Sequence, residues 1–186
     1  MIALLRPALV FLGGFTLLLG LAVPLGFTGL AGAVFPQEAG GSLIRQEGRV
    51  IGSALIAQRF EGPEWFHPRP SAAGEDGFDA AASGASNLGP TSAALLEAVR
   101  TRIGGARDVP ADAATASGSG LDLHITPANA RAQVARVAAA RARPEAEVLA
   151  LVAAHTEERL LGVLGEPRVN VLRLNLALAA GTPGMR

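Results

Sequence analysis

Residues 114–130 read "ATASGSGLDLHITPANA" and combine features of several kinds of site. Two Ser-Gly pairs, an aspartate and a histidine precede Thr126-Pro127. That residue pair is typical of a helix start, because threonine caps free backbone N–H groups and proline fits the first helical turn. The stretch therefore has three interpretations: a catalytic loop, a phosphate-binding loop at a helix N-terminus, or a tight turn.

A catalytic interpretation would use Ser119 as a nucleophile. The nucleophile elbow of α/β-hydrolases follows G-x-S-x-G, whereas Gly118 and Gly120 flank this serine directly. Asp122 and His124 could complete a triad, but their closeness in sequence does not indicate that three groups converge in space. We expect a structural turn, with a membrane-tethered extracytoplasmic serine hydrolase as the alternative. A phosphate-binding loop is weakly indicated, because every capped helix start presents free N–H groups.

The helix that starts at Thr126-Pro127 is expected to bury its apolar positions Val134, Val137 and Ala138. Its arginines do not follow one stripe, and a solvated face or a partner contact would explain them. They are Arg131, Arg136, Arg141 and Arg143.

Helices are also predicted on both sides of this one. Residues 90–103 open with a proline, and a Gly-Gly pair follows them. The apolar positions at helical spacing are Leu96, Val99 and Ile103. A third helix begins at Pro144, with acidic residues in its first turn, where the helix dipole favours them. It is expected to bury Val148, Leu151 and Val152.

The remaining soluble segments are less regular. Residues 41–60 contain two apolar runs separated by polar residues and Gly48, which predicts a β-hairpin. Residues 61–89 are rich in Gly, Pro, Ser and Asp, and form either a long ordered loop or a disordered linker. Residues 168–180, "RVNVLRLNLALAA", are a strand or a helix with Asn170 as a candidate cap. The expected fold class is α/β (α+β), with a hairpin and three to four helices.

The N-terminal region predicts a membrane anchor. Residues 7–36 carry no charge, and about 20 apolar residues suffice to cross a bilayer. Pro24 and nearby glycines indicate a kink, or a helix end near residues 24–29. The alternative is a cleaved signal peptide with Ala31-Gly32-Ala33 as its cleavage site. We expect an anchor over residues 1–36 and, since Arg6 favours a cytoplasmic N-terminus, an extracytoplasmic domain over residues 37–186.

The composition of the 186 residues excludes several functions. Sixteen basic and sixteen acidic residues leave no net charge, which argues against nucleic-acid binding. The absence of cysteine excludes disulfides and thiolate metal sites, and the absence of lysine excludes a Walker A loop. The three histidines, His67, His124 and His155, are far apart, so structural roles are favoured over a metal site.

A second polar cluster, "SGASNLGPTS" at residues 83–92, precedes the first predicted soluble helix. Asn87 is expected to bond a backbone N–H in a turn, and Asp122 is expected to do the same in the other cluster. Two such turns in one small domain could also form a binding surface.

Five motifs in order resemble one family. They are "FHPRPSA" (66–72), "SGASNLGPTS" (83–92), "VPADAATASGSGLDLHITPANARAQVARVAAAR" (109–141), "HTE" (155–157) and "LGEPRVNVLRLNLAL" (164–178). Together with the single apolar N-terminal segment, they are similar to the C subunit of the bacterial Kdp potassium-transporting P-type ATPase. Phe78 stands where the family usually has tyrosine.

The resemblance implies a non-catalytic subunit with a single span in the inner membrane and no cofactor or metal of its own. Its implied partners are a channel-like potassium-translocating subunit, an ATP-hydrolysing subunit and a small peptide subunit. Two roles are attributed to the family: assembly, and raising the ATP affinity of the hydrolysing subunit. Gln133 matches a proposed nucleotide ligand, yet the expected orientation places it outside the cell, away from ATP.

The other residues of the matching motifs are expected to serve structure or interaction. They are Arg69, Ser71, Ser83, Asn87, Gly89, Ser117, Gly118, Ser119, Gly120, Asp122, His124, Arg136, Glu166, Asn170 and Asn175.

Overall fold

The computed structural model describes residues 2–181 and divides the chain into two compact units, Met1–Val50 and Ile51–Arg186. The predicted boundary between the membrane anchor and the extracytoplasmic domain, at residue 36, is a different kind of boundary, because it marks where the chain leaves the lipid. It stays a prediction. The mixed α and β character of the chain is confirmed.

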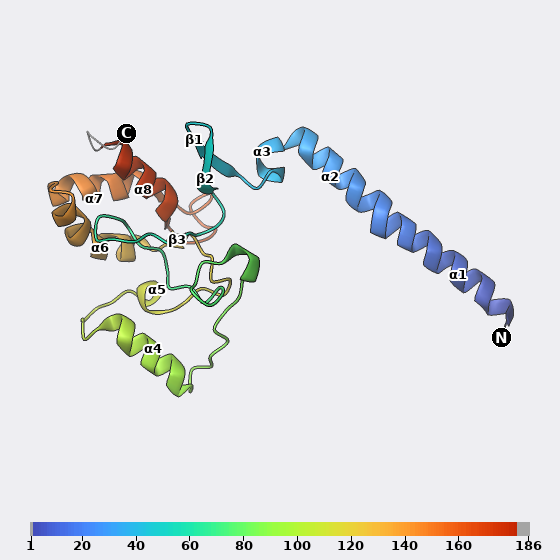
Figure 1. Ribbon diagram of the computed structural model, residues 1–186, viewed down its shortest axis with the longest axis horizontal. Helices are drawn as coiled ribbons and strands as arrows, with labels where there is room; N and C mark the ends of the chain where they lie inside the picture. Colours follow the sequence, from blue (N-terminus) through green and yellow to red (C-terminus); the bar gives the residue numbers. More distant parts are fainter. Residues whose placement is uncertain (1, 182–186) are drawn as a thin grey trace. The chain divides into compact units, whose positions relative to one another are not determined.

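A long apolar helix forms most of the first unit (Figure 1). It comprises α1 (Ile2–Leu17), a π-helical turn (Leu18–Ala22) and α2 (Val23–Val34). The stretch Ala3–Val34 spans 32 residues, and its most apolar window has a mean hydropathy of 2.3 with none of its residues buried. At 1.5 Å per residue the helix is about 48 Å long, which exceeds the ~30 Å of a hydrocarbon core. It is long and apolar enough to cross a membrane.

The π-helical turn explains how this helix passes Pro24. Proline has no N–H, and its ring crowds the carbonyl four residues earlier. The N–H of Val23 bonds to the carbonyl of Leu18, five residues back, so the turn is widened just before the proline. Of the two alternatives predicted around Pro24, a kink or a helix end near residues 24–29, the helix end is wrong, because the widened turn lets the helix continue to Val34.

The predicted hairpin is confirmed. After the short α3 (Pro36–Ala39), β1 (Leu43–Gln46) pairs with β2 (Arg49–Ser53). The two turn residues, Glu47 and Gly48, have φ angles of 50° and 79°. Two positive φ angles define the two-residue turn that matches the twist of paired strands.

The second unit is built on three helices and a small sheet. The helices are α6 (Pro127–Ala140), α7 (Glu145–Ala154) and α8 (Val171–Ala180). In the antiparallel sheet, β5 (Arg168–Asn170) lies between β3 (His124–Ile125) and β4 (Thr156–Glu157). His124 is opposite Asn170, and Thr156 is opposite Val169. Residues 168–180 are thus a strand followed directly by a helix.

The core lies between these helices and the sheet. The predicted apolar positions Val134, Val137, Ala138, Val148 and Val152 are buried in it, and Leu151 packs against it while partly exposed. The other buried members are Phe66, Ile125, Ala130, Val169, Val171, Leu174 and Leu178.

Helix α4 (Ala93–Ile103) lies apart from α6, α7 and α8 (Figure 1). It starts later than predicted, because the Ser92 hydroxyl accepts a hydrogen bond from the N–H of Leu95 and so caps the helix. None of its residues is buried, and Leu96 is 50% exposed, so its predicted apolar face does not join the core. The short α5 (Ala111–Ala114) follows it.

Residues 61–89 form an ordered loop with a single 3-10 turn, Ala80–Ala82. The Asp79 carboxylate caps that turn by accepting from the N–H of Ala81 at 2.8 Å. The alternative of a disordered linker is therefore wrong, and the contacts that order this loop form the candidate site.

Candidate functional site

The segment of residues 62–69, called here the 62–69 segment, is tied to the core through its backbone. The side-chain amide of Asn175 on α8 accepts from the N–H of Phe66 and donates to the carbonyl of Phe66, both at 2.9 Å. The Phe66 ring is fully buried, and Asn175 is 1% exposed. An irregular segment has no strand partner for its backbone, and here a buried amide satisfies those groups instead.

Gln133 on α6 holds the next residue of this segment in the same way. Its Oε1 accepts from the N–H of His67 at 2.8 Å and from Arg136 Nη2 at 2.7 Å. Its Nε2 donates to the carbonyl of His67 at 3.1 Å and to Asn129 Oδ1 at 3.0 Å. A side-chain amide has two donor and two acceptor positions, and protein groups occupy all four.

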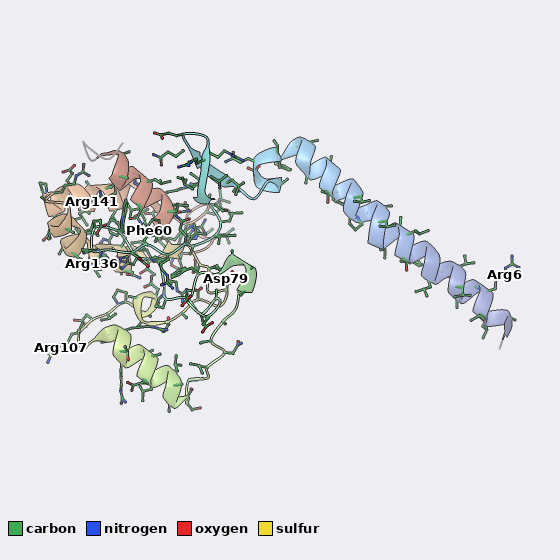
Figure 2. All side chains as sticks on the ribbon, viewed as in Figure 1. Arg6, Phe60, Asp79, Arg107, Arg136 and Arg141 are labelled. Atoms are coloured by element: carbon green, nitrogen blue, oxygen red, sulfur yellow. The ribbon has the colours of Figure 1, made fainter. Side chains whose placement is uncertain are left out.

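Two arginines, Arg136 on α6 and Arg141 at its C-terminus, bind carbonyls of the same segment. Both are labelled in Figure 2. Arg136 Nη1 donates to the carbonyls of Pro63 at 2.7 Å and Trp65 at 2.9 Å. Arg141 Nε donates to the carbonyl of Glu64 at 2.7 Å, and its guanidinium lies 4.4 Å from the centre of the Trp65 ring. The expectation of a merely solvated face is therefore wrong for these two arginines, whereas a partner contact stays a prediction.

A carboxylate of the chain itself occupies the N-terminus of α6. Asp112 Oδ2 accepts from the N–H of Thr126 at 2.7 Å and from Asn129 Nδ2 at 3.1 Å, while Oδ1 accepts from the Thr126 hydroxyl at 3.0 Å. The Thr126 hydroxyl in turn accepts from the N–H of Asn129. The helix dipole favours an anion at this position, and Asp112 provides one, so no open phosphate-binding loop exists there.

The two serine-rich turns meet each other. Ser119 contributes its carbonyl, which accepts from the N–H of Gly84 at 2.9 Å and from the Ser83 hydroxyl at 3.0 Å. The Ser71 hydroxyl donates to the carbonyl of Gly120 at 2.6 Å and also accepts from the N–H groups of Ala73 and Phe78. The turns are thus ordered and packed in one unit, as expected.

Gly120 is required at this junction. Its φ is 68°, and an added Cβ would lie 2.6 Å from the Ala73 nitrogen and 2.8 Å from the Gly84 carbonyl oxygen. Gly118 differs, since nothing lies within 4 Å of a Cβ at that position.

Asp122 links this junction to Arg69 and to the sheet. Its Oδ2 accepts from Arg69 Nη1 at 3.2 Å, and its Oδ1 accepts from the N–H of His124 at 3.0 Å. Arg69 also donates to the carbonyl of Ala116, and the hydroxyl of the buried Ser117 accepts from the N–H of Asp122. The expected backbone bond of Asp122 is confirmed.

The catalytic interpretation receives no support from this geometry. The Ser119 hydroxyl accepts from the N–H of Leu121 at 3.1 Å, and within residues 2–181 it is not bonded to His124. The carboxylate of Asp122 is 3.9 Å from His124 Nδ1, beyond hydrogen-bond distance. Asp122 and His124 therefore lie near each other, but Ser119 and His124 do not form a nucleophile and base pair.

Four other predicted residues lie outside this network: Asn170, Glu166, Asn87 and Gly89. Asn170 caps α8 by accepting from the N–H of Arg173 at 3.1 Å, as expected, and Glu166 pairs with Arg159 at 2.6 Å on the surface. The expectation for Asn87 is wrong. Its side chain is exposed and bonds to nothing in the described part of the chain, and its φ of 52° is a conformation that asparagine tolerates better than most residues. Gly89 is exposed, and its carbonyl accepts from the N–H of Ser92.

A pocket of about 420 Å³ lies where the 62–69 segment approaches α6. Its lining includes Arg59, Arg69, His67, Gln133 and Arg136. Burial, followed by the positive charge of Arg136, lowers the pKa of His67, although the carbonyl of Gly62 lies 2.9 Å from its Nε2 and favours a protonated nitrogen there. Across residues 2–181, no group of three or more His, Cys, Asp or Glu side chains is placed to hold a metal ion.

Sequence reasoning missed Asp112 and the role of Arg141. Asp112 lies 14 residues before Thr126, the residue whose N–H it binds, and its only sequence signal is that it is the single charged residue of "VPADAATASGSG". Arg141 resembles any other arginine at a helix end, and the sequence contains no signal for its contact with Trp65.

Similar proteins identify the family. Residues 5–180 match the family described as KdpC, the c chain of the K+-transporting ATPase. A potassium-transporting ATPase KdpC subunit from Gemmatimonas aurantiaca is 57% identical, with 98% of this chain and 96% of that protein aligned. Subunits of the same description from Caulobacter vibrioides and Rhodospirillum rubrum are 55% and 56% identical, each with 96% of its own length aligned to 98% and 96% of this chain. The match extends from the apolar helix to the end of α8, and the chain belongs to the KdpC family of K+-transporting ATPase subunits.

Proposed function

We propose that this chain is a non-catalytic subunit that anchors in the inner membrane and assembles a K+-transporting ATPase. Its partners are the potassium-translocating subunit, the ATP-hydrolysing subunit and a small peptide subunit. The observation that carries the proposal is that the polar side chains of the candidate site form their hydrogen bonds within the chain. Gln133, Asp112, Arg136 and Asn175 all bind groups of the chain itself, so they hold the fold in one conformation instead of forming a reactive centre.

The long apolar helix supports assembly as the main role. A helix of this length holds a protein in a bilayer almost irreversibly. Confinement beside other membrane subunits raises their effective concentration, so modest contacts outside the lipid suffice for a stable complex.

The proposal assigns Gln133 to the 62–69 segment and not to a nucleotide. ATP could bind its amide only if at least one of the four hydrogen bonds to His67, Asn129 and Arg136 were broken. A lost hydrogen bond to a buried group costs about 1–3 kcal/mol. The proposed orientation, with residues 37–186 outside the cytoplasm, also separates Gln133 from cytosolic ATP.

The test compares Gln133→Leu with Arg131→Ala, an exposed neighbour on α6, in the complete complex. The fraction of complex that retains this chain is measured beside the KM for ATP. We expect Gln133→Leu to reduce retention and to leave the KM of the remaining complex unchanged, and Arg131→Ala to change neither. A raised KM with full retention would instead establish Gln133 as a nucleotide ligand.

The orientation has its own test, because the chain contains no cysteine. Glu61 is a suitable position for one, since its side chain is 82% exposed. In intact spheroplasts, Glu61→Cys should react with a membrane-impermeant thiol reagent. Protection until the cells are lysed would place the domain in the cytoplasm and return ATP contact to consideration.

A further inference from the structure

The turn between β4 and β5 exposes four large apolar side chains. Leu160 is 66% exposed, Leu161 85%, Val163 73% and Leu164 58%. Residues 160–164, called here the apolar turn, lie outside the long N-terminal helix. Single exposed leucines are common on soluble surfaces, whereas a contiguous apolar group of this kind marks an interaction site.

The apolar turn has a fixed conformation. The N–H of Leu160 bonds to the carbonyl of Leu164 at 2.9 Å, and the N–H of Leu164 bonds to the carbonyl of Leu160 at 3.0 Å. Two ion pairs lie near its base, Arg159 with Glu166 at 2.6 Å and Arg168 with Glu157 at 2.9 Å. The exposed side chains are therefore presented on a preorganised turn, and ordering them on binding has a reduced entropic cost.

Leu161 is in an unfavourable backbone conformation for its residue type. Its φ is 54°, in the left-handed region where a Cβ is crowded and where Gly or Asn is usual. Glycine at this position would form the same turn with less strain. The leucine adds no core contact, since most of its side chain faces solvent, and what it contributes is exposed apolar area.

The charges around the turn distinguish between two kinds of occupant. Three acidic residues, Glu157, Glu158 and Glu166, are balanced by three basic ones, Arg159, Arg168 and Arg173. Segments that bind a bilayer surface are enriched in basic residues and in Trp or Tyr, and residues 157–173 contain no aromatic side chain. An apolar centre with a polar, charge-balanced rim is instead the composition of a protein interface.

We propose that the apolar turn inserts into an apolar recess on another subunit of the ATPase. This inference rests on the proposed role as an assembly subunit, since that role supplies the partner. Leu161 forms the centre of the contact and the ion-paired residues form its rim.

The first experiment uses the full chain, co-expressed with the partner subunits, and compares Leu161→Asn with Leu149→Gln. Asparagine tolerates the left-handed conformation, so the turn is expected to keep its shape. Leu149 on α7, 44% exposed, provides the matched control. We expect Leu161→Asn to weaken association about tenfold or more, as loss of one buried leucine would do, while the isolated full chain in detergent is no less stable to unfolding than the unaltered chain. Association equal to that of the unaltered chain would overturn the inference.

A second experiment distinguishes binding of the turn to a partner subunit from binding to the bilayer. It also distinguishes failure of this inference from failure of the proposed function. An environment-sensitive dye on Val163→Cys is observed in the full chain in vesicles of phosphatidylethanolamine and phosphatidylglycerol. A blue shift that appears only when the partner subunits are added supports the proposal, and a shift in vesicles alone assigns the turn to lipid and overturns it. If the unaltered chain failed to associate with the other subunits at all, the assembly role would fail as well, whereas a defect of Leu161→Asn alone locates the contact.

Discussion

The side-chain amide of Asn175 on α8 pairs with both backbone groups of Phe66, 109 residues earlier in the chain, through two hydrogen bonds of 2.9 Å. The pair connects an irregular segment to the last helix of the core. Because Phe66 is fully buried, its N–H and carbonyl have no access to water and depend on this amide.

Replacing Asn175 by alanine should destabilise the protein by about 3 kcal/mol, since two hydrogen bonds are lost and two backbone groups are left buried without partners. Urea unfolding of the full chain in detergent measures the change. Trp65, the only tryptophan, is adjacent to Phe66 and reports on this segment by fluorescence. Asn87→Gly is the control, because the Asn87 side chain is exposed and glycine suits its positive φ. Equal stability of the two variants would show that the amide pair contributes little.

The glycines of the Ser-Gly-Ser-Gly stretch should respond very differently to alanine. Gly120→Ala introduces a Cβ 2.6 Å from the Ala73 nitrogen at a φ of 68°, so both overpacking and backbone strain oppose it, by about 2–4 kcal/mol together. Gly118→Ala has open space around it and should change the free energy of unfolding by no more than about 0.5 kcal/mol. Denaturant unfolding of both variants under identical conditions tests the contrast. A similar loss of unfolding free energy in both variants would contradict the role of Gly120 at the junction with Ser71, Ala73 and Gly84.

The sequence predicts those parts of the fold that depend on local chemistry. Thr126-Pro127 starts α6, as its capping chemistry indicates, and the apolar spacing of Val134 and Val137 identifies the buried face of that helix. Such features require only neighbouring residues. The apolar N-terminal helix is predicted for the same reason. The way in which it continues past Pro24 is not predicted, because that depends on a widened turn.

The candidate site could be predicted only in part, because its contacts connect distant residues. Asn175 and Gln133 bond to backbone groups, which every residue has, so no side-chain pattern marks their partners. The sheet escaped prediction since β3 and β4 have two residues each, too few to show alternation. Tertiary pairing alone makes these residues strands.

The domain should become less stable as the pH decreases, in a pH range set by its histidines. Burial, together with the charge of Arg136, lowers the pKa of His67, and burial and Arg168 likewise lower the pKa of His124. The folded protein therefore binds these protons less readily than the unfolded chain, whose histidines titrate near 6.5. Above that pH both states are neutral at these positions and the full stability is present. As the pH falls from about 6.5 toward the lowered folded pKa values, only the unfolded state gains protons, and stability decreases.

Urea unfolding followed by Trp65 fluorescence at pH 7.5 and pH 5.5 measures this decrease. The interval lies above the range in which most carboxylates titrate, so the two histidines dominate it. His67→Gln can still donate toward the carbonyl of Gly62 but cannot bind a proton, and it should reduce the difference between the two pH values. The double variant with His124→Gln should reduce it further. A difference that persists undiminished in the double variant would mean that the burial of these rings is not what makes folding sensitive to acid.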